Sequence, residues 1–403
     1  MDSLTQIVLG ASVGEAVLGR RIGNRAMVWG GLAGTLPDLD VLSGAVTDPL
    51  SALAYHRAFT HSLAFAFLAA PVLGLALHRI YRGRAPVGTA FGAVGALWLI
   101  ILAGSYRMPV PVYGIPAIAT VITAVFAALA GTILLLQRWR GTLRTRPEAG
   151  AAGWVLLFFL AIVTHPLLDC FTAYGTQFLQ PFSSFRIAWN TVSVVDPFYT
   201  LPFLLLLLFA ARSGRNARVR RYLNTAGLLV SSGYLLLTIV NARHVRSVID
   251  RTLAEAGVRA DRSFHSPALG SNVLWSATVQ SGGDYYLGQY SLLDRRRRLT
   301  PFERVPGRHE LLAPYAGERA VGILTWFTDD YYTVFPGAGD TVLVCDLRYG
   351  AVGGTVRDPD GYLFQWAIDT TDRPLRAVQR DFSGGPDGSD FLGQMWTRLQ
   401  GVD

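Results

Sequence analysis

Residues 56–80 read HRAFTHSLAFAFLAAPVLGLALHRI, so a run with two histidines stands directly before a stretch of membrane-grade hydrophobicity. Two other polar runs lie against apolar stretches in the same way, at residues 37–40 (PDLD) and 165–169 (HPLLD). An ionisable side chain in such surroundings is costly unless it is paired, metal-bound or functional. The three runs therefore indicate a site inside a helical membrane protein.

The composition of the whole chain supports the membrane class. Of its 403 residues, 51% are hydrophobic and only 16% are charged, whereas ordinary soluble domains carry roughly 25% charged residues. Segments that approach or reach the ~20 residues of a spanning helix are expected at 57–80, 86–106, 114–137, 151–172, 197–212 and 222–242. Two shorter segments, at 5–19 and 26–43, raise the expected number of spans from six to at most eight.

The distribution of arginines predicts the orientation of these segments. Arginines cluster after every second segment: Arg20, Arg21, Arg25, Arg79, Arg82, Arg84, Arg138, Arg140, Arg144, Arg146, Arg212, Arg215, Arg218, Arg220 and Arg221. Such an excess is typical of cytoplasmic loops, and it accounts for most of the formal net charge of +8 without indicating nucleic-acid binding. The same parity places the N-terminus outside the cytoplasm and brings the three polar runs to one outer face.

The first two runs supply candidate ligands with different local geometries. Asp38 and Asp40 share a face only in an extended or turn conformation, and a pair of helix-capping carboxylates is the alternative. His56 and His61 are about 140° apart on a regular helix, so we expect His56 just before a helix and His61 in its second turn. An interfacial histidine pair is the alternative interpretation of that run.

The third run and the start of the next apolar segment complete the set. His165 and Asp169 are adjacent on one helical face, a spacing by which one helix can give two ligands, although a simple hydrogen bond between them would use the same spacing. Asp196 could add another carboxylate. Because aspartate and histidine suit zinc or a similar divalent ion, a metal site is the leading hypothesis.

Together with the opening residues 1–5 (MDSLT), the runs PDLD, HRAFTHS and HPLLD resemble the YdjM/YbcI-like bacterial inner-membrane proteins, a family assigned as metal-dependent hydrolases. The resemblance covers roughly residues 1–200. It implies a distant relation to zinc-dependent phospholipase C and single-strand nucleases, whose helical fold holds a multi-zinc phosphoesterase site. Carried over residue by residue, it marks as candidate ligands Asp38, Asp40, His56, His61, His165 and Asp169.

The N-terminal run departs from the family pattern. Many members have histidine where this chain has Gln6, an amide that binds zinc poorly although it can hold a ligand water. One metal position would then be lost or altered. Asp2 is close by in sequence and could compensate, with a solvated N-terminal carboxylate as the alternative.

Other polar residues are not assigned to the site. Glu15, inside the first apolar segment, is expected to pair with an arginine of the cytoplasmic side, with a buried proton carrier as the alternative. The histidines outside the runs lack ligand-like neighbours in sequence: His78, His244, His265 and His309. Two isolated cysteines, Cys170 and Cys345, do not make a disulfide framework.

Beyond residue 242 the composition changes. Alternating, aromatic and β-branched stretches separated by Gly, Asp and Pro predict strands at 273–279, 320–328, 341–347 and 362–368, after a linking helix near 243–257. We therefore expect a membrane domain over 1–242 and an extracytoplasmic domain over 243–403.

The predicted fold is an α-helical polytopic membrane bundle of six to eight spans with a C-terminal, mostly antiparallel β domain outside the cytoplasm. The predicted function is that of a metal-dependent hydrolase at the outer face of a bacterial inner membrane, with zinc as the favoured ion and Asp38 or Asp40 as general base. The expected substrate is a phosphoester such as a lipid headgroup. Membrane lipids are the expected partners, nucleic acid is not, and the sequence does not indicate an oligomeric state.

Two other classes of function use the same residues. A non-catalytic membrane scaffold would hold its helices together with a structural metal clasp, whose ligand set is closed. An ion-coupled transporter would use the groups as an ion relay, but it should carry polar residues on to the inner face, and apart from Glu15 and scattered Ser and Thr this chain has few.

Overall fold

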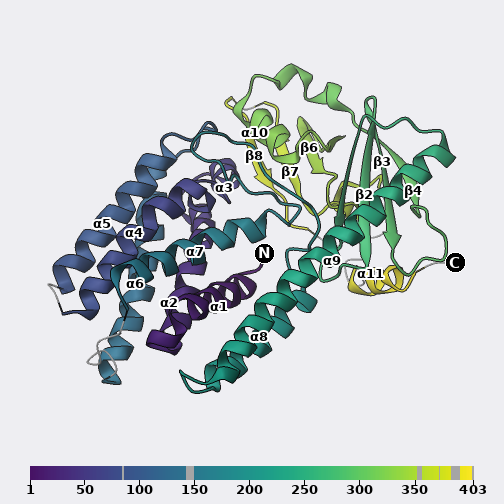
Figure 1. Cartoon of the computed structure of the whole chain (residues 1–403). Coiled ribbons are helices and arrows are strands. Elements are labelled where there is room, and N and C mark those ends of the chain that lie inside the picture. Colours follow the sequence, from purple (N-terminus) through teal and green to yellow (C-terminus); the bar gives the residue numbers. More distant parts are fainter. Residues whose placement is uncertain (84–85, 142–148, 352–355, 372, 383–390, 402–403) are drawn as a thin grey trace. The chain divides into compact units, whose positions relative to one another are not determined.

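The computed structural model describes residues 1–83, 86–141, 149–351, 356–371, 373–382 and 391–401. The chain forms two compact units (Figure 1). The first unit comprises residues 1–189 and 197–235, and the second comprises residues 190–196 and 236–403. Their boundary lies within one continuous helix, α9 (Arg218–Ala256), so the span expected at 222–242 and the linking helix expected near 243–257 are a single element.

The first unit is built of helices. They are α1 (Ser3–Ile22), α2 (Asn24–Thr35), α3 (Pro49–Tyr55), α4 (Leu63–Tyr81), α5 (Pro86–Ser105), α6 (Ile115–Trp139), α7 (Ala151–Asp169), α8 (Pro197–Arg212) and the first part of α9, with short 3-10 helices η1 (Pro37–Ala45) and η2 (Phe59–His61). In the described part of the chain, five helices are long and apolar enough to cross a membrane: α4, α5, α6, α7 and α9. The apolar helix α8 has only 16 residues, so the span expected at 197–212 is shorter than the usual spanning length.

The segment expected to run from 57 to 80 begins later than the sequence suggested. Ser62 caps α4 by accepting a hydrogen bond from the backbone N–H of Phe65 at 3.0 Å, so the helix starts at Leu63. The expectation that His61 lies in the second turn of this helix is wrong, because His61 ends η2 before the helix begins. His56 does precede the helix, as the C-terminal cap of α3.

Glycines set the close packing of α1 against α2. A Cβ atom on Gly14 would collide with the carbonyl oxygen of Ala26, and one on Gly30 would collide with that of Gly10. Small residues at such spacing let two helix backbones approach closely in a membrane protein. The approach carries the C-terminal end of α2, and with it Gly34, next to α7.

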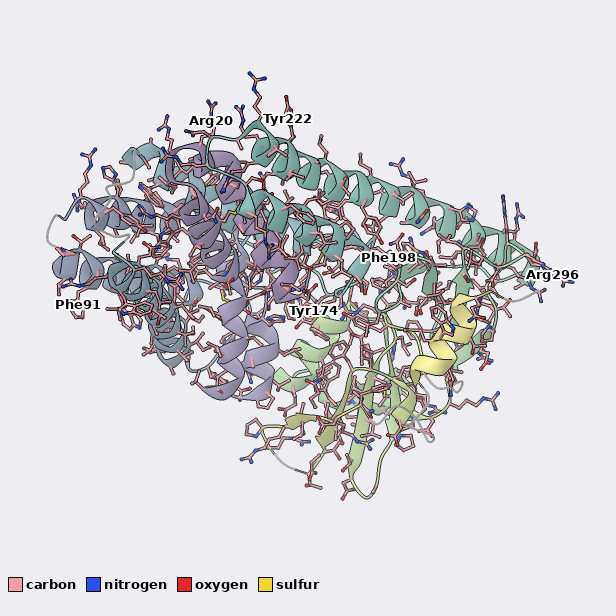
Figure 2. The ribbon with its side chains drawn as sticks, turned by 90° about the horizontal axis from the view of Figure 1, so that it is seen from below. Arg20, Phe91, Tyr174, Phe198, Tyr222 and Arg296 are labelled. Carbon is pink, nitrogen blue, oxygen red and sulfur yellow. The ribbon has the colours of Figure 1, made fainter. Side chains whose placement is uncertain are left out.

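The arginine-bearing loops of the first unit lie side by side. Arg215 donates to the carbonyl oxygen of Arg21 at 3.1 Å, and Asn24 donates to that of Ala211 at 3.0 Å. Figure 2 shows Arg20 and Tyr222 at the same edge, away from Tyr174, which follows α7. The arginine-bearing junctions of α1 with α2 and of α8 with α9 therefore share one end of the unit, as their parity predicts; Arg84, Arg144 and Arg146 lie outside the described residues.

Glu15 forms the buried ion pair expected for it. Its Oε1 accepts a hydrogen bond from Nε of Arg220 at 2.6 Å, and its Oε2 contacts Nη2 of the same guanidinium. Both side chains are buried. The pair joins α1 to α9, and its two hydrogen bonds offset the cost of placing the charges among helices.

The second unit contains two four-stranded antiparallel sheets with neighbour order β1-β2-β3-β4 and β5-β6-β7-β8. The strands are β1 (Arg262–Pro267), β2 (Leu274–Ser281), β3 (Asp284–Ser291), β4 (Phe302–Pro306), β5 (Tyr332–Pro336), β6 (Thr341–Asp346), β7 (Gln365–Asp369) and β8 (Arg376–Gln379). Two helices also belong to it, α10 (Arg319–Thr328) and α11 (Phe391–Leu399), with 3-10 turns η4 (His309–Leu311), η5 (Ala313–Tyr315) and η6 (Pro359–Gly361).

Three of the four expected strands are present, but the one expected at 320–328 is the helix α10. Its buried side chains include Ala320, Ile323, Leu324 and Phe327, which is the i, i+3, i+4, i+7 pattern of an amphipathic helix. The β-branched and aromatic content of the segment favoured a strand, whereas the spacing of its buried side chains is that of a helix. Both cysteines are buried and free.

Candidate metal centre

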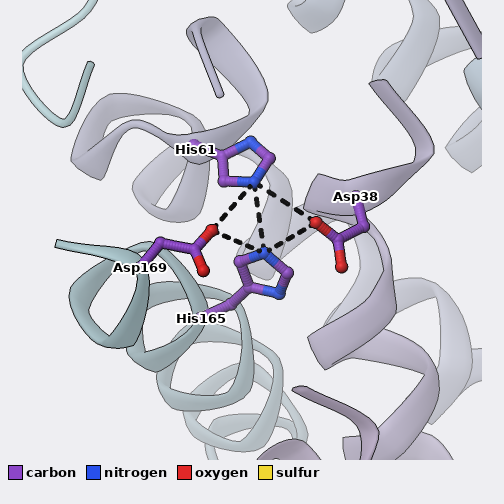
Figure 3. Close-up of side chains that lie close together, drawn as sticks. All are labelled: Asp38, His61, His165 and Asp169. Carbon is purple, nitrogen blue, oxygen red and sulfur yellow. Dashed lines mark hydrogen bonds and ion pairs between the residues drawn. The ribbon is translucent and has the colours of Figure 1, made fainter. Parts of the chain in front are cut away.

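Four side chains of the first unit converge at the end of α7 (Figure 3). Asp38 comes from η1, His61 from η2, and His165 and Asp169 from successive turns of α7. One potential ligand atom from each residue lies within 4.8 Å of the other three. We call these four residues the metal centre.

The distances place two nitrogens and two oxygens around one point. The Nε2 atoms of His61 and His165 are 3.1 Å apart. Asp38 Oδ1 lies 3.6 Å and 3.3 Å from these two nitrogens, and Asp169 Oδ2 lies 3.4 Å from each. The side chains of His61, His165 and Asp169 are fully buried, whereas that of Asp38 is 15% exposed. Asp38 is thus the member that solvent reaches.

Neighbouring acceptors fix which nitrogen of each imidazole points at the centre. His165 Nδ1 lies 2.5 Å from the carbonyl oxygen of Gly34, and His61 Nδ1 lies 3.1 Å from Asp40 Oδ2. Both partners are acceptors, so each Nδ1 carries a proton, and each ring offers the lone pair of Nε2 to the centre once Nε2 is deprotonated. Ligating histidines in metalloproteins are held in this way by a carbonyl or carboxylate.

This arrangement fits a divalent cation. Two imidazole lone pairs that face each other at 3.1 Å repel unless a proton or a metal ion lies between them. Asp169 Oδ2 is buried and accepts no hydrogen bond from the described residues, although Arg57 Nε lies 3.4 Å away. A ligand set of two nitrogens and two carboxylate oxygens is suited to zinc and to similar divalent ions.

The charges around His61 oppose the effect of its burial. Burial alone lowers the pKa of the His61 imidazole, but the charge of Asp40 and the contacts with the carboxylates of Asp169, Asp38 and Asp40 outweigh it and raise this pKa well above the ordinary value. Burial likewise raises the pKa of Asp40, but His56 and His61 outweigh it and hold that pKa well below its usual range. A metal ion would therefore have to displace a proton from the imidazole at neutral pH.

Asp40 and His56 lie beside the metal centre rather than within the group of four. Asp40 is fully buried and accepts from the backbone N–H of Arg57 at 2.7 Å, in addition to its contact with His61. Its Oδ1 lies 2.9 Å from Nδ1 of His56, whose side chain is 29% exposed. Asp40 thus orients His61, and through Asp40 the buried His61 is connected to the partly exposed His56.

The N-terminal run does reach the centre. Gln6 Nε2 donates to Asp169 Oδ1 at 2.9 Å and to the carbonyl oxygen of His165 at 3.3 Å, while its buried Oε1 has no hydrogen-bond partner among the described residues. Asp2 instead caps α1 through Thr5, whose backbone N–H donates to it at 3.0 Å. Asp196 is buried in the second unit and is not one of the four.

Arg57 is a member of the site that the sequence interpretation did not assign. Its guanidinium lies beside Asp169 and donates to Thr172 Oγ1 at 2.7 Å, while its backbone N–H holds Asp40. Its φ of 56° is unusual for a residue other than glycine, and such strain concentrates at functional sites. The only signal in the sequence is its position between the two histidines of the HRAFTHS run, since backbone strain cannot be read from residue identity.

Comparisons with known proteins agree with the membrane class. A family model described as "YdjM inner membrane protein" matches residues 1–107 and 114–245. Among curated proteins, the uncharacterized protein YfhP of Bacillus subtilis (strain 168) is 26% identical over 160 residues, which is 40% of this chain and 46% of that protein. The match thus spans about half the length of this relative. No solved structure matches the chain.

Proposed function

The chain belongs to the family of YdjM inner membrane proteins, and from that premise we propose that it is a membrane-bound, metal-dependent hydrolase that works at the outer face of the bacterial inner membrane. The observation that carries the proposal is the metal centre, in which two histidine nitrogens and two carboxylate oxygens lie within 4.8 Å of one another. The family name itself describes only a membrane protein. The proposed location puts both termini and the second unit outside the cytoplasm.

The residues around the centre have the roles that metal-assisted hydrolysis requires. A divalent ion, for which zinc is our proposal, would lower the pKa of a bound water and polarise the scissile bond. Asp38 is the partly exposed ligand and the best-placed general base, while Asp40 uses its oxygens to orient His61, His56 and the backbone of Arg57. His56, held by Asp40 and partly exposed, can carry a proton between the centre and solvent.

We propose a phosphoester, such as a lipid headgroup, as the substrate. The centre lies where α7 ends and just before α4 begins, and both helices are long and apolar enough to cross a membrane. The ends of such helices lie at the level of the headgroups. A substrate whose polar group is a phosphoester would therefore meet the centre without leaving the membrane, which makes membrane lipids the proposed partners.

Metal analysis of the detergent-purified protein, followed by a panel of phosphoester substrates, tests the proposal. His61→Ala and Asp169→Ala should lose bound metal and hydrolysis together, because they remove members of one ligand set. His78→Ala and His265→Ala are the matched controls and should keep both near wild type, since neither residue belongs to the centre. Equal metal content in all four variants would contradict the proposal.

A structural metal clasp is the second candidate, because three of the four ligands are fully buried and four ligands complete a tetrahedral zinc site. It predicts that the wild-type protein binds metal and that the metal raises its thermal stability, with no hydrolysis of any phosphoester. Turnover that follows metal content across the variants above would exclude a purely structural role.

A further inference from the structure

Two guanidinium groups and an imidazole surround the ring of Tyr174 in the loop after α7. The Cζ atoms of Arg57 and Arg186 lie over the ring at 5.1 Å and 5.0 Å from its centroid. The His56 ring meets it edge to face, with centroids 5.0 Å apart. Cations over an aromatic face are attracted by the ring quadrupole, so the Tyr174 ring helps to position both guanidiniums.

This cluster is continuous with the metal centre. Arg57 Nε lies 3.4 Å from Asp169 Oδ2, the buried oxygen of the centre, and its position is further fixed by the hydrogen bond to Thr172. The carbonyl oxygen of Arg57 accepts from the backbone N–H of Gln177 at 2.9 Å, which ties the strained residue to the loop that carries Tyr174. His56 reaches the centre through Asp40.

The charges of these groups favour an anionic ligand. One divalent ion would balance the negative charges of Asp38 and Asp169. Counting side chains alone, the two arginines then exceed the remaining carboxylate, Asp40, by one positive charge, and the N-terminal ammonium of Met1, which contacts Asp169, adds further positive charge. Tyr174, Arg186 and His56 are only partly buried, so they lie between the buried centre and solvent.

We propose that Arg57 and Arg186, held over Tyr174, bind the phosphate oxygens of an anionic phosphoester whose scissile bond lies at the metal centre. Guanidinium groups match the geometry of phosphate oxygens and form charge-assisted hydrogen bonds to them. The inference rests on the proposed function, and it goes further by naming the charged group of the substrate and the side chains that select it.

The same phosphate chemistry occurs in lipid headgroups and in water-soluble phosphate esters. The loop beyond Tyr174 carries two strongly exposed aromatic side chains, Phe182 at 86% and Phe185 at 67%. Exposed Phe side chains can insert at the boundary between headgroups and acyl chains, as they do on interfacial helices. The affinity for a lipid phosphate should therefore depend on these rings, whereas the affinity for a water-soluble phosphate ester should not.

The test measures binding of inorganic phosphate to zinc-loaded protein in detergent by calorimetry, with metal content determined on the same samples. Arg186→Gln should keep the metal and weaken phosphate binding by about tenfold or more, as expected for loss of a charged hydrogen-bond partner. Arg304→Gln is the control, because Arg304 pairs with Asp284 at an exposed position of the second unit and should leave phosphate affinity unchanged.

A second arm identifies the source of the phosphate. Vesicles of phosphatidylcholine with phosphatidic acid are compared with glycerol phosphate as ligands, using the wild type and Phe182→Ser. Weaker binding of the vesicles alone by Phe182→Ser would assign a lipid, and equal affinities of both variants for both ligands would assign a free phosphate ester. Either result supports the proposed phosphate-binding site formed by Arg57 and Arg186, which we call the anion site.

The anion site and the hydrolase fail in different ways. Wild-type phosphate affinity in Arg186→Gln, or no phosphate binding by the wild type, would overturn the anion site even if metal and hydrolysis are present. Conversely, Arg186-dependent phosphate binding by a protein that holds no metal would support the anion site and contradict the metal-dependent hydrolase.

Discussion

Asp40 connects three parts of the site. It is fully buried and contacts the imidazoles of His56 and His61 as well as the backbone N–H of Arg57. A carboxylate in this position keeps Nδ1 of His61 protonated and leaves Nε2 for a ligand, as outer-shell carboxylates do in other metal sites. Its contribution is therefore to orientation and basicity.

Asp40→Asn should change the number of protons that metal binding releases. In the wild type the pKa of His61 is raised well above its ordinary value, chiefly by Asp40 acting against burial, so the metal-free imidazole is protonated at neutral pH and zinc must displace that proton. Affinity should therefore fall as the pH is lowered. Without the Asp40 charge the pKa of His61 drops, and about one proton fewer should be released at pH 7.

Calorimetry in two buffers of different ionisation enthalpy measures this proton release. The variant should also bind zinc about 10-fold to 100-fold more weakly, since it loses the carboxylate behind a ligand. Identical proton release and affinity in wild type and Asp40→Asn would show that Asp40 does not act on the metal centre.

Gln6→His should raise zinc affinity or occupancy. Gln6 already contacts Asp169 and the backbone of His165, so an imidazole at this position brings a further nitrogen donor to the edge of the centre. Gln137→His is the control, because Gln137 lies near the far end of α6 in contact with Tyr81. Competition titration with a zinc indicator gives both affinities; no difference between the variants would remove the N-terminal run from the site.

At the scale of elements, the α1–α2 pair determines where Gly34 lies, and Gly34 determines how His165 is held. The two helices touch through glycines, and the carbonyl oxygen of Gly34 fixes the Nδ1 proton of His165. Backbone packing between α1 and α2 therefore helps to position His165 in the metal centre, in addition to the side-chain contacts.

Gly30→Ala should both destabilise the first unit and weaken metal binding. The new Cβ would collide with backbone atoms of Gly10 and Gly14, and overpacking of this kind costs about 1–3 kcal/mol. Gly92→Ala, in α5, is the matched helical control, because nothing lies within 4 Å of its added Cβ. Thermal melting and zinc titration of the two variants check this; equal behaviour would show that close helix approach does not support the site.

On the scale of the whole molecule, the first unit has two chemically different ends. Arginine-bearing loops meet at the junctions of α1 with α2 and of α8 with α9, and the metal centre lies at the opposite ends of α1 and α7. The excess of arginine marks the cytoplasmic side in bacterial membrane proteins, so the metal centre is expected to face outward.

Reporter fusions test this orientation. An alkaline phosphatase reporter placed after Asp403 should be active, because that enzyme folds only outside the cytoplasm, and a tag within 212–217 should react with impermeant reagents only after the inner membrane is opened. A green fluorescent fusion after Asp403 is the reciprocal control and should be dark when exported unfolded. A cytoplasmic C-terminus would contradict the outer location of the site.

The sequence by itself determined the membrane class, most of the helices, the Glu15–arginine pair and the three polar runs, because hydropathy, charge and helical spacing are local properties of the chain. It also determined that His165 and Asp169 share a helical face. Only the tertiary structure decided that Asp38 joins them and His61 in one group while Asp40 lies behind His61, since two aspartates two residues apart are equivalent until their neighbours are in place. The Tyr174 cluster was decided there too, because contacts between residues more than a hundred positions apart depend on how the helices pack.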